Sequence, residues 1–244
     1  MWQSPRKSFV PAFSLIELSI VLVILGLLTG GILAGQSLVH AAELRSVSIE
    51  WNRYQTAIYT FRDKYFALPG DMANASSVWP TATNGPGSGM IGTYWTGGVR
   101  LWQHLSLAGL IEGKFTGTMT GPYAGSGGCV GNVECPASKL QSLIYEALTV
   151  SNPNTPPYTI NGKNGISLNS GISMDWSTGM KPIDAYNIDR KIDDGAPGSG
   201  NIFGMGPGGF SNGDGWSTCA TDSAGTSYIY TGTGNSCRPF FAIK

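Results

Sequence analysis

Three aspartates in the C-terminal half of the chain could form a cation site. Asp189, Asp193 and Asp194 lie in the stretch "IDRKIDDGAPGSG", just before a Gly/Pro turn. Ca²⁺ is bound by hard oxygen ligands on such turns, so these three carboxylates are candidate ligands for a structural Ca²⁺. Their spacing does not match an EF-hand loop. The alternative is a solvated acidic helix end, where Arg190 and Lys191 offset the charge.

Four cysteines form two local pairs, Cys129 with Cys135 and Cys219 with Cys237. Both pairs lie in Gly/Ser/Asn-rich sequence, where packing alone holds a chain weakly. A zinc site is disfavoured because there is no C-x-x-C and the chain has only two histidines. We expect two short-range disulfides in an oxidising compartment, each contributing about 2–4 kcal/mol. Four reduced cysteines in a cytosolic protein are the alternative.

A single carboxylate, Glu17, interrupts a long apolar segment. From Phe13 to Ala42 it is the only charged side chain, apart from the titratable His40. As a helix, this segment would be about 45 Å long, enough to cross the core of a bilayer. Arg6 and Lys7 precede it and are expected to stay cytoplasmic, which places the rest of the chain beyond the inner face.

Two simpler interpretations of this segment are a secretory signal peptide and a plain signal anchor. A secretory signal peptide has an apolar core of about 7–15 residues, whereas this run is longer and continues into an amphipathic pattern. A plain signal anchor fits the length but gives Glu17 no partner. A carboxylate in a membrane segment is costly, and a protein that assembles could supply the partner from a neighbouring chain.

The stretch "PAFSLIELSIVLVILGLL" resembles the N-terminus of type IV prepilins and type II secretion pseudopilins. The resemblance implies that a prepilin peptidase removes residues 1–12 by cutting between Ala12 and Phe13, and that the new amino terminus of Phe13 is methylated. Glu17 then becomes the fifth mature residue. It implies that Glu17 pairs with the amine of Phe13 on an adjacent subunit, and that one long helix and a globular head together form a ladle shape.

The segment departs from this family in two respects. Ala12 stands where the family usually has Gly before the cut; since Ala is the nearest substitute in size, we still expect cleavage. No proline occurs between Phe13 and Tyr65, although many members carry one in this helix. Four glycines could supply local melting or close packing instead, as two overlapping small-xxx-small pairs, or be ordinary membrane-helix glycines. They are Gly26, Gly30, Gly31 and Gly35.

The pattern of residues 43–68 is typical of an amphipathic continuation of the transmembrane and polymerisation helix, 13–42. Seven apolar residues recur at alternating spacings of three and four, and the charged residues fall off this stripe. The stripe consists of Leu44, Val47, Trp51, Tyr54, Ile58, Phe61 and Tyr65. We expect it to pack on a head and to end at "LPGDM" (68–72), because Pro69 and Gly70 do not continue a helix.

Residues 69–244 predict an α+β head with a mainly antiparallel sheet, because short apolar runs alternate with Gly/Ser/Asn/Pro-rich turns. Strands are expected at 143–150, 165–169, 226–232 and 238–244, although the first could equally be helical. Helices are expected at 97–113 and from Pro182. His104 lies beside Trp102 in the first of these helices, where a core or solvent-edge role is favoured over a catalytic one.

Composition argues against two classes of function. The formal net charge is zero and 12% of the residues are charged, so a dedicated nucleic-acid binder is disfavoured. An enzyme is also disfavoured, because the chain lacks a G-x-S-x-G, a P-loop and an H-E-x-x-H motif. Apart from the candidate Ca²⁺, no cofactor is expected.

The family resemblance implies a structural subunit of a type IV pilus or a type II secretion pseudopilus. Its partners would be copies of itself or other pilin-like subunits, the prepilin peptidase, the inner-membrane assembly machinery and the membrane. Before assembly it would be a single-pass inner-membrane protein with a periplasmic head, and afterwards part of an extracellular pilus or a periplasmic pseudopilus. The alternatives are a minor or tip pilin with an adhesive or ligand-binding head and a signal-anchored periplasmic binding protein.

Overall fold

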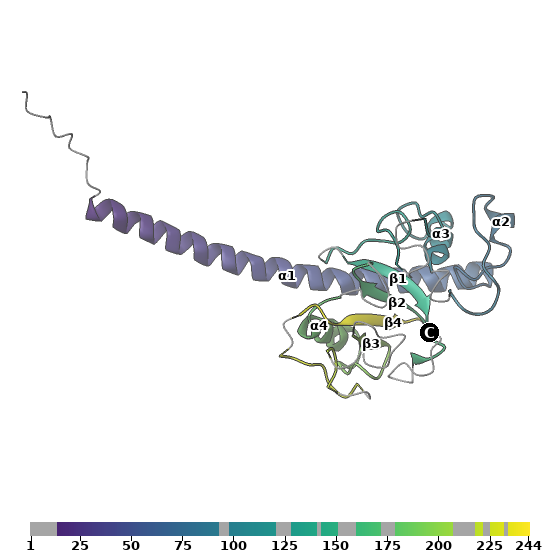
Figure 1. Ribbon diagram of the computed structural model, residues 1–244. Coiled ribbons are helices and arrows are strands. Elements are labelled where there is room, and N and C mark those ends of the chain that lie inside the picture. The colour runs from purple at the N-terminus through teal and green to yellow at the C-terminus, as the bar shows by residue number, and fades with distance from the viewer. Residues whose placement is uncertain are drawn as a thin grey trace, which may run out of the picture. The chain divides into compact units, whose positions relative to one another are not determined.

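The structure is a computed structural model, and it describes residues 14–92, 98–120, 128–140, 143–150, 160–171, 179–206, 218–221, 225–231 and 234–244. The chain divides into two compact units, Met1–Ala42 and Glu43–Lys244. Each unit is described by itself. Figure 1 labels the helices and strands in chain order.

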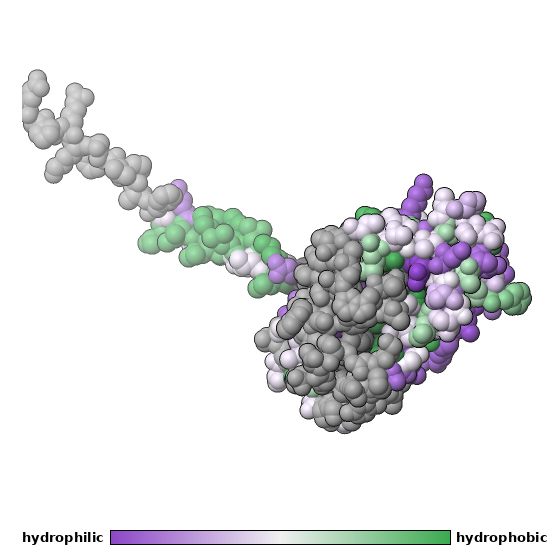
Figure 2. Space-filling view, turned by 45° about the vertical axis from the view of Figure 1, so that its right-hand side comes forward, coloured by the Kyte–Doolittle hydropathy of each residue, from purple (hydrophilic) through white to green (hydrophobic). Residues whose placement is uncertain are grey.

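The described part of the first unit is the beginning of helix α1 (Leu15–Tyr65). Its large apolar side chains are exposed, from Leu15 at 86% to Val39 at 59%, and Figure 2 shows this stretch largely in green. By length and composition, α1 is the one helix in the described part of the chain that could cross a membrane. Such an apolar surface requires cover from lipid or from other chains.

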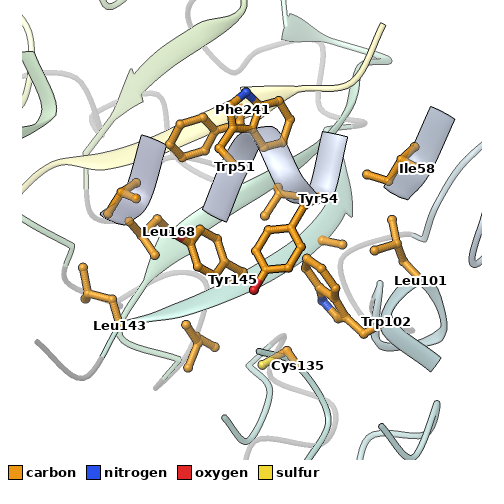
Figure 3. Close-up of a cluster of buried hydrophobic side chains, with 14 of the residues drawn as sticks. Trp51, Tyr54, Ile58, Leu101, Trp102, Cys135, Leu143, Tyr145, Leu168 and Phe241 are labelled. Atoms are coloured by element: carbon orange, nitrogen blue, oxygen red, sulfur yellow. The ribbon is translucent and has the colours of Figure 1, made fainter. Parts of the chain in front are cut away.

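The rest of α1 buries one face in the head. Val47, Trp51, Tyr54, Ala57, Ile58 and Phe61 are buried, while the ends of the predicted stripe, Leu44 and Tyr65, are partly buried. The Trp51 ring lies 5.0 Å from that of Phe241, and Tyr54 meets Tyr145 edge-on at 5.0 Å (Figure 3). The predicted stripe is therefore confirmed. The helix ends at Tyr65 rather than at residue 68, because Phe66 leaves helical geometry with a φ of 50°.

Four strands form one antiparallel sheet in the order β1-β2-β4-β3. They are β1 (Ile144–Thr149), β2 (Asn164–Asn169), β3 (Ile202–Met205) and β4 (Arg238–Ala242). Adjacent residues of a strand point to opposite faces. Phe241 accordingly joins the core that contains Trp51 of α1, whereas Phe240 belongs to a second, smaller apolar cluster with Leu148 and Phe203. The predicted α+β fold, a long N-terminal helix with an antiparallel sheet, is confirmed.

Three of the four predicted strands are present, as β1, β2 and β4. The strand expected at 226–232 is wrong: within the described residues 225–231, the only β-pairing is an isolated bridge between Tyr228 and Ala220. The strand β3 was missed because its run of apolar residues, "IFGM", is only four residues long and contains a glycine.

The described part of the head contains three shorter helices, namely α2 (Ala75–Val78), α3 (Val99–Leu107) and α4 (Pro182–Ile192). The helix that starts at Pro182 is confirmed, with proline in its first turn. The other predicted helix ends six residues before Gly113. Gly109 adopts a φ of 71°, and Leu110 donates its N–H to the carbonyl of Leu105 at 3.0 Å, which closes the helix.

Candidate functional site

The three aspartates singled out in the sequence come together at the end of α4. One carboxylate oxygen from each of Asp189, Asp193 and Asp194 lies within 4.8 Å of the other two. Asp189 occupies the last turn of the helix, and Asp193 is the residue at which the backbone leaves helical geometry. The local sequence thus places one carboxylate on the helix and two in the turn that follows it. We refer to these three residues as the acidic turn.

Asp189 is fully buried and is held from two directions. The hydroxyl of Tyr228, 39 residues away, donates to Oδ2 at 2.8 Å, and the N–H of Gly195 donates to Oδ1 at 3.2 Å. Burial is the main reason that the pKa of Asp189 is raised to about 7; the nearby charges of Asp194 and Asp193 add to the rise, and the hydrogen bonds from Tyr228 and Gly195 oppose it. Asp189 can therefore hold a proton near neutral pH.

Asp193 fixes the connection from the turn to β3. Its carboxylate accepts the backbone N–H groups of Asn201 and Ile202, the second at 3.2 Å. Gly200 has a φ of 68°, and a Cβ there would overlap the carboxylate of Asp193, so this position requires glycine. Asp194 closes the turn on its other side, where it accepts a hydrogen bond from the hydroxyl of Ser199 at 2.6 Å.

The acidic turn supplies three carboxylates, whereas Ca²⁺ takes six to eight oxygen ligands. Further ligands would have to come from backbone carbonyls or water. Each carboxylate already accepts hydrogen bonds, and these order the turn between α4 and β3. The donor chemistry fits Ca²⁺, and the hydrogen bonds equally fit the alternative of an acidic helix end. Calcium binding stays a prediction.

Both expected disulfides are present, and no cysteine is free. Cys129 and Cys135 have their Cα atoms 6.1 Å apart, and Cys219 and Cys237 have theirs 4.8 Å apart. The second disulfide closes the loop that carries Tyr228, the residue that donates to the acidic turn. The cysteine pairing therefore helps to place a hydrogen-bond donor that sequence reasoning did not identify.

Two buried polar residues hold backbone segments together through hydrogen bonds. His104 is fully buried, as expected for a core residue. Its Nδ1 accepts the N–H of Gly70 at 2.9 Å, and its Nε2 donates to the carbonyl of Thr83 at 2.8 Å. This pairing requires a neutral ring, and burial lowers the pKa of His104 accordingly. Glu134, which the sequence did not single out, is also buried and accepts the N–H of Val130 at 3.0 Å inside the first disulfide loop.

Glu17 takes part in the start of α1. The N–H of Ser14 donates to Oε2 of Glu17 at 2.9 Å, and the N–H of Ile16 approaches Oγ of Ser14 at 3.4 Å. This arrangement is a variant of a capping box: Glu17 reaches back to the N–H of Ser14, and Ser14 faces the N–H of Ile16 instead of that of Glu17. The sequence "SLIE", from Ser14 to Glu17, carries the signal for such a cap. The cleavage-site residues Ala12 and Phe13 lie outside the described residues.

The four glycines of α1 have open surroundings within the chain. A Cβ added at Gly26, Gly30, Gly31 or Gly35 would meet no atom within 4 Å. Among the described residues, no packing requires their small size.

Comparison with known proteins identifies no relative. No protein-family model matches the chain, and no curated protein or solved structure matches it either.

Proposed function

We propose that this chain is a pilin-like structural subunit, which joins a filament through α1 after residues 1–12 have been removed. The observation that carries the proposal is the first part of α1, where an exposed apolar surface contains a single acid, Glu17, near its start. Two observations support the same function: "PAFSLIELSIVLVILGLL" resembles the N-terminus of prepilins, and a head with an antiparallel sheet follows the long helix in the chain. The partners proposed are copies of this chain or other pilin-like subunits.

The charge of Glu17 is the reason to expect a partner chain. The hydrogen bond from Ser14 satisfies that N–H, but among the described residues no opposite charge meets the carboxylate of Glu17. An uncompensated charge is strongly penalised in a low-dielectric environment, and an opposite charge nearby relieves that penalty. We propose that the amine of Phe13 on a neighbouring subunit supplies this charge, which would favour one register between the helices.

The proposed location follows from the same helix. One long apolar helix near the N-terminus is compatible with a membrane anchor or a signal. We propose a single-pass inner-membrane protein with its head in the periplasm before assembly. The two disulfides support an oxidising location for the head.

The first test is the mass of the N-terminal peptide of the protein from its native membranes and sheared filaments. The proposal predicts a chain that starts at N-methylated Phe13. Ala12→Gly is the matched control, because it restores the residue that the family usually has and should be processed at least as completely. Recovery of wild-type chains that start at Met1, while Ala12→Gly is cleaved, would show that Ala12 blocks processing and would refute the proposal for the native chain.

The second test separates the charge of Glu17 from its role in the cap. Glu17→Gln keeps a capping-box residue but removes the charge, whereas Glu17→Ala removes both. If the charge drives incorporation, both variants should insert in the membrane, and both should be at least tenfold depleted in sheared filaments. Normal incorporation of Glu17→Gln together with loss of Glu17→Ala would assign Glu17 to the helix cap alone.

A further inference from the structure

Asn-Gly pairs occur in the chain at 84–85, 161–162, 164–165 and 212–213. In such a pair, the backbone nitrogen of the glycine can attack the side-chain amide carbon of the asparagine, because no Cβ of the glycine shields that nitrogen. A fold that holds the asparagine side chain in hydrogen bonds opposes this attack. The structure describes the first three pairs, and the fourth lies outside the described residues.

The pair Asn164–Gly165 is held firmly at the start of β2. Oδ1 of Asn164 accepts the N–H of Ile91 at 3.0 Å and the hydroxyl of Thr149, and its Nδ2 donates to the carbonyl of Gly89 at 2.8 Å. Both ends of the side-chain amide are therefore engaged. Asn164 cannot turn this amide towards the backbone nitrogen of Gly165 without breaking these hydrogen bonds and disturbing the sheet.

The pair Asn84–Gly85 is exposed at Asn84 but is also held. Oδ1 of Asn84 accepts the N–H of Ser76 at 2.8 Å, and the N–H of Gly85 donates to the carbonyl of Met72 at 2.8 Å. Gly85 lies so close to its neighbours that a Cβ there would overlap the backbone of Asp71. This crowding leaves little room for a ring to form at the pair.

The pair Asn161–Gly162 lies in an exposed turn just before β2. Among the described residues, no hydrogen bond holds the side chain of Asn161. Gly162 has open surroundings, since a Cβ there would meet no atom within 4 Å. The restraint on this pair is a backbone hydrogen bond, from the N–H of Gly162 to the carbonyl of Val150 at 2.6 Å. That bond has to open before the nitrogen can attack, and an exposed turn opens more readily than a strand inside a sheet.

We propose that Asn161 is a site of spontaneous deamidation, and that it reacts before Asn84 and Asn164. The nitrogen of Gly162 bonds to Cγ of Asn161, the Cγ–Nδ2 bond breaks, and Nδ2 leaves as ammonia with the proton from Gly162. Water then opens the succinimide ring that has formed. Cleavage of the bond to Cγ gives aspartate, and cleavage of the bond to the main-chain carbonyl carbon gives isoaspartate. Overall, water is consumed, ammonia is released, and nothing is oxidised or reduced.

Both products change the turn before β2. Each places a new carboxylate two residues before Lys163. Isoaspartate also lengthens the backbone by a carbon atom between Asn161 and Gly162, which displaces the N–H of Gly162 from the carbonyl of Val150. The inference goes beyond the proposed filament function and does not depend on it, because the reaction needs only this turn and water.

The test incubates the folded, full-length chain in mild detergent and ¹⁸O-labelled water at mildly alkaline pH, and then maps its tryptic peptides by mass spectrometry. Trypsin cuts after Lys163, so Asn161 and Asn164 fall in different peptides, and Asn84 lies in a third. Heavy oxygen marks every residue that deamidates during the incubation. We expect Asn161 to react at least about tenfold faster than Asn84 or Asn164, whose side-chain hydrogen bonds must also break. A faster reaction at Asn84 or Asn164 would overturn the proposal.

The matched control is the same chain unfolded in urea, where the fold no longer restrains any of the pairs. The rates at Asn84, Asn161 and Asn164 should then agree within about threefold. If the unfolded chain shows the same preference for Asn161 as the folded one, the local sequence and not the structure sets the order, and the inference is wrong. Reaction at Asn161 only in urea would also contradict it, since the bond from Gly162 to Val150 would then be enough to protect the pair.

Asn161→Gln checks the assignment within the peptide. The substitution keeps an exposed amide, but its longer side chain would have to form a larger and less favoured ring, so the labelled product should disappear from this peptide. Label that persists there would place the reaction at another residue and overturn the proposal. The products formed by the unaltered chain test the route: a mixture of aspartate and isoaspartate is expected, and aspartate alone would mean direct hydrolysis without attack by Gly162.

Discussion

Replacing Asp189 by asparagine tests whether the acidic turn makes the head sensitive to pH. In the folded chain, burial raises the pKa of Asp189 from 3.8 to about 7. Between these values the folded state holds a proton that the unfolded chain has lost. The stabilisation is therefore fully present below about pH 4 and is lost as the pH rises through 7. A change of about three pH units at 1.36 kcal/mol each amounts to at most about 4 kcal/mol.

Asp189→Asn is neutral at every pH, keeps the shape of the side chain, and can still accept the hydrogen bond from Tyr228. The quantity to measure is the difference in unfolding free energy between variant and wild type, from urea unfolding of the metal-free, full-length chain in mild detergent. This difference should move by about 2–4 kcal/mol in favour of the variant between pH 4 and pH 8. Glu146, whose pKa is also raised to about 7 by burial, contributes equally to both chains and cancels.

The matched control is Asp63→Asn, because that carboxylate is exposed on α1. Its difference from wild type should stay within about 0.5 kcal/mol across the same pH range. A difference for Asp189→Asn that is equally constant from pH 4 to pH 8 would refute the reasoning, since it would mean that the buried carboxylate carries no proton of its own in the folded state.

The same variant tests the predicted calcium site. Ca²⁺ binds carboxylates that have lost their protons, so a site at the acidic turn should be stronger at pH 8 than at pH 5. Millimolar Ca²⁺ at pH 8 should then raise the melting temperature of the wild type and not that of Asp189→Asn. No shift in the wild type would leave the acidic turn as a hydrogen-bonded helix end.

Three further predictions test the head. Losing the Cys219–Cys237 disulfide should cost about 3 kcal/mol in urea unfolding, more than losing the shorter Cys129–Cys135 loop; equal costs would contradict this. His104→Ala should cost about 2–4 kcal/mol, because two buried hydrogen bonds and a packed ring are lost; a melting curve like that of wild type would contradict it. Gly98→Ala should unfold or strongly destabilise the head, because its Cβ would overlap the carbonyl of Ala147, whereas Gly234→Ala should change little.

Features that depend on near neighbours in the chain were predictable from the sequence. The stripe from Leu44 to Tyr65 follows from the helical period, and it is buried as expected. The cysteine pairs were predictable because short loops close at low entropic cost. The turn after α4 brings its aspartates together for a similar reason, since all three lie within six residues of one another.

Features that depend on distant contacts were not predictable. The strand at 226–232 was wrong because a strand also needs a partner to pair with along its length, which a local pattern does not reveal. The donor of the hydrogen bond to Asp189 lies 39 residues away, and the ring of His104 joins a backbone group 34 residues away. A local sequence pattern does not predict these distant hydrogen-bond partners.

The sequence by itself determined the long helix, its apolar and amphipathic parts and the two disulfides, because backbone geometry fixes periods of a few residues. Only the tertiary structure decided the strand order β1-β2-β4-β3, the burial of Asp189 and the exposure of Phe66. The physical reason is that burial is a property of the whole fold. The solvent exposure of a side chain, and with it the pKa of a carboxylate, is set by segments that fold against it from far along the chain.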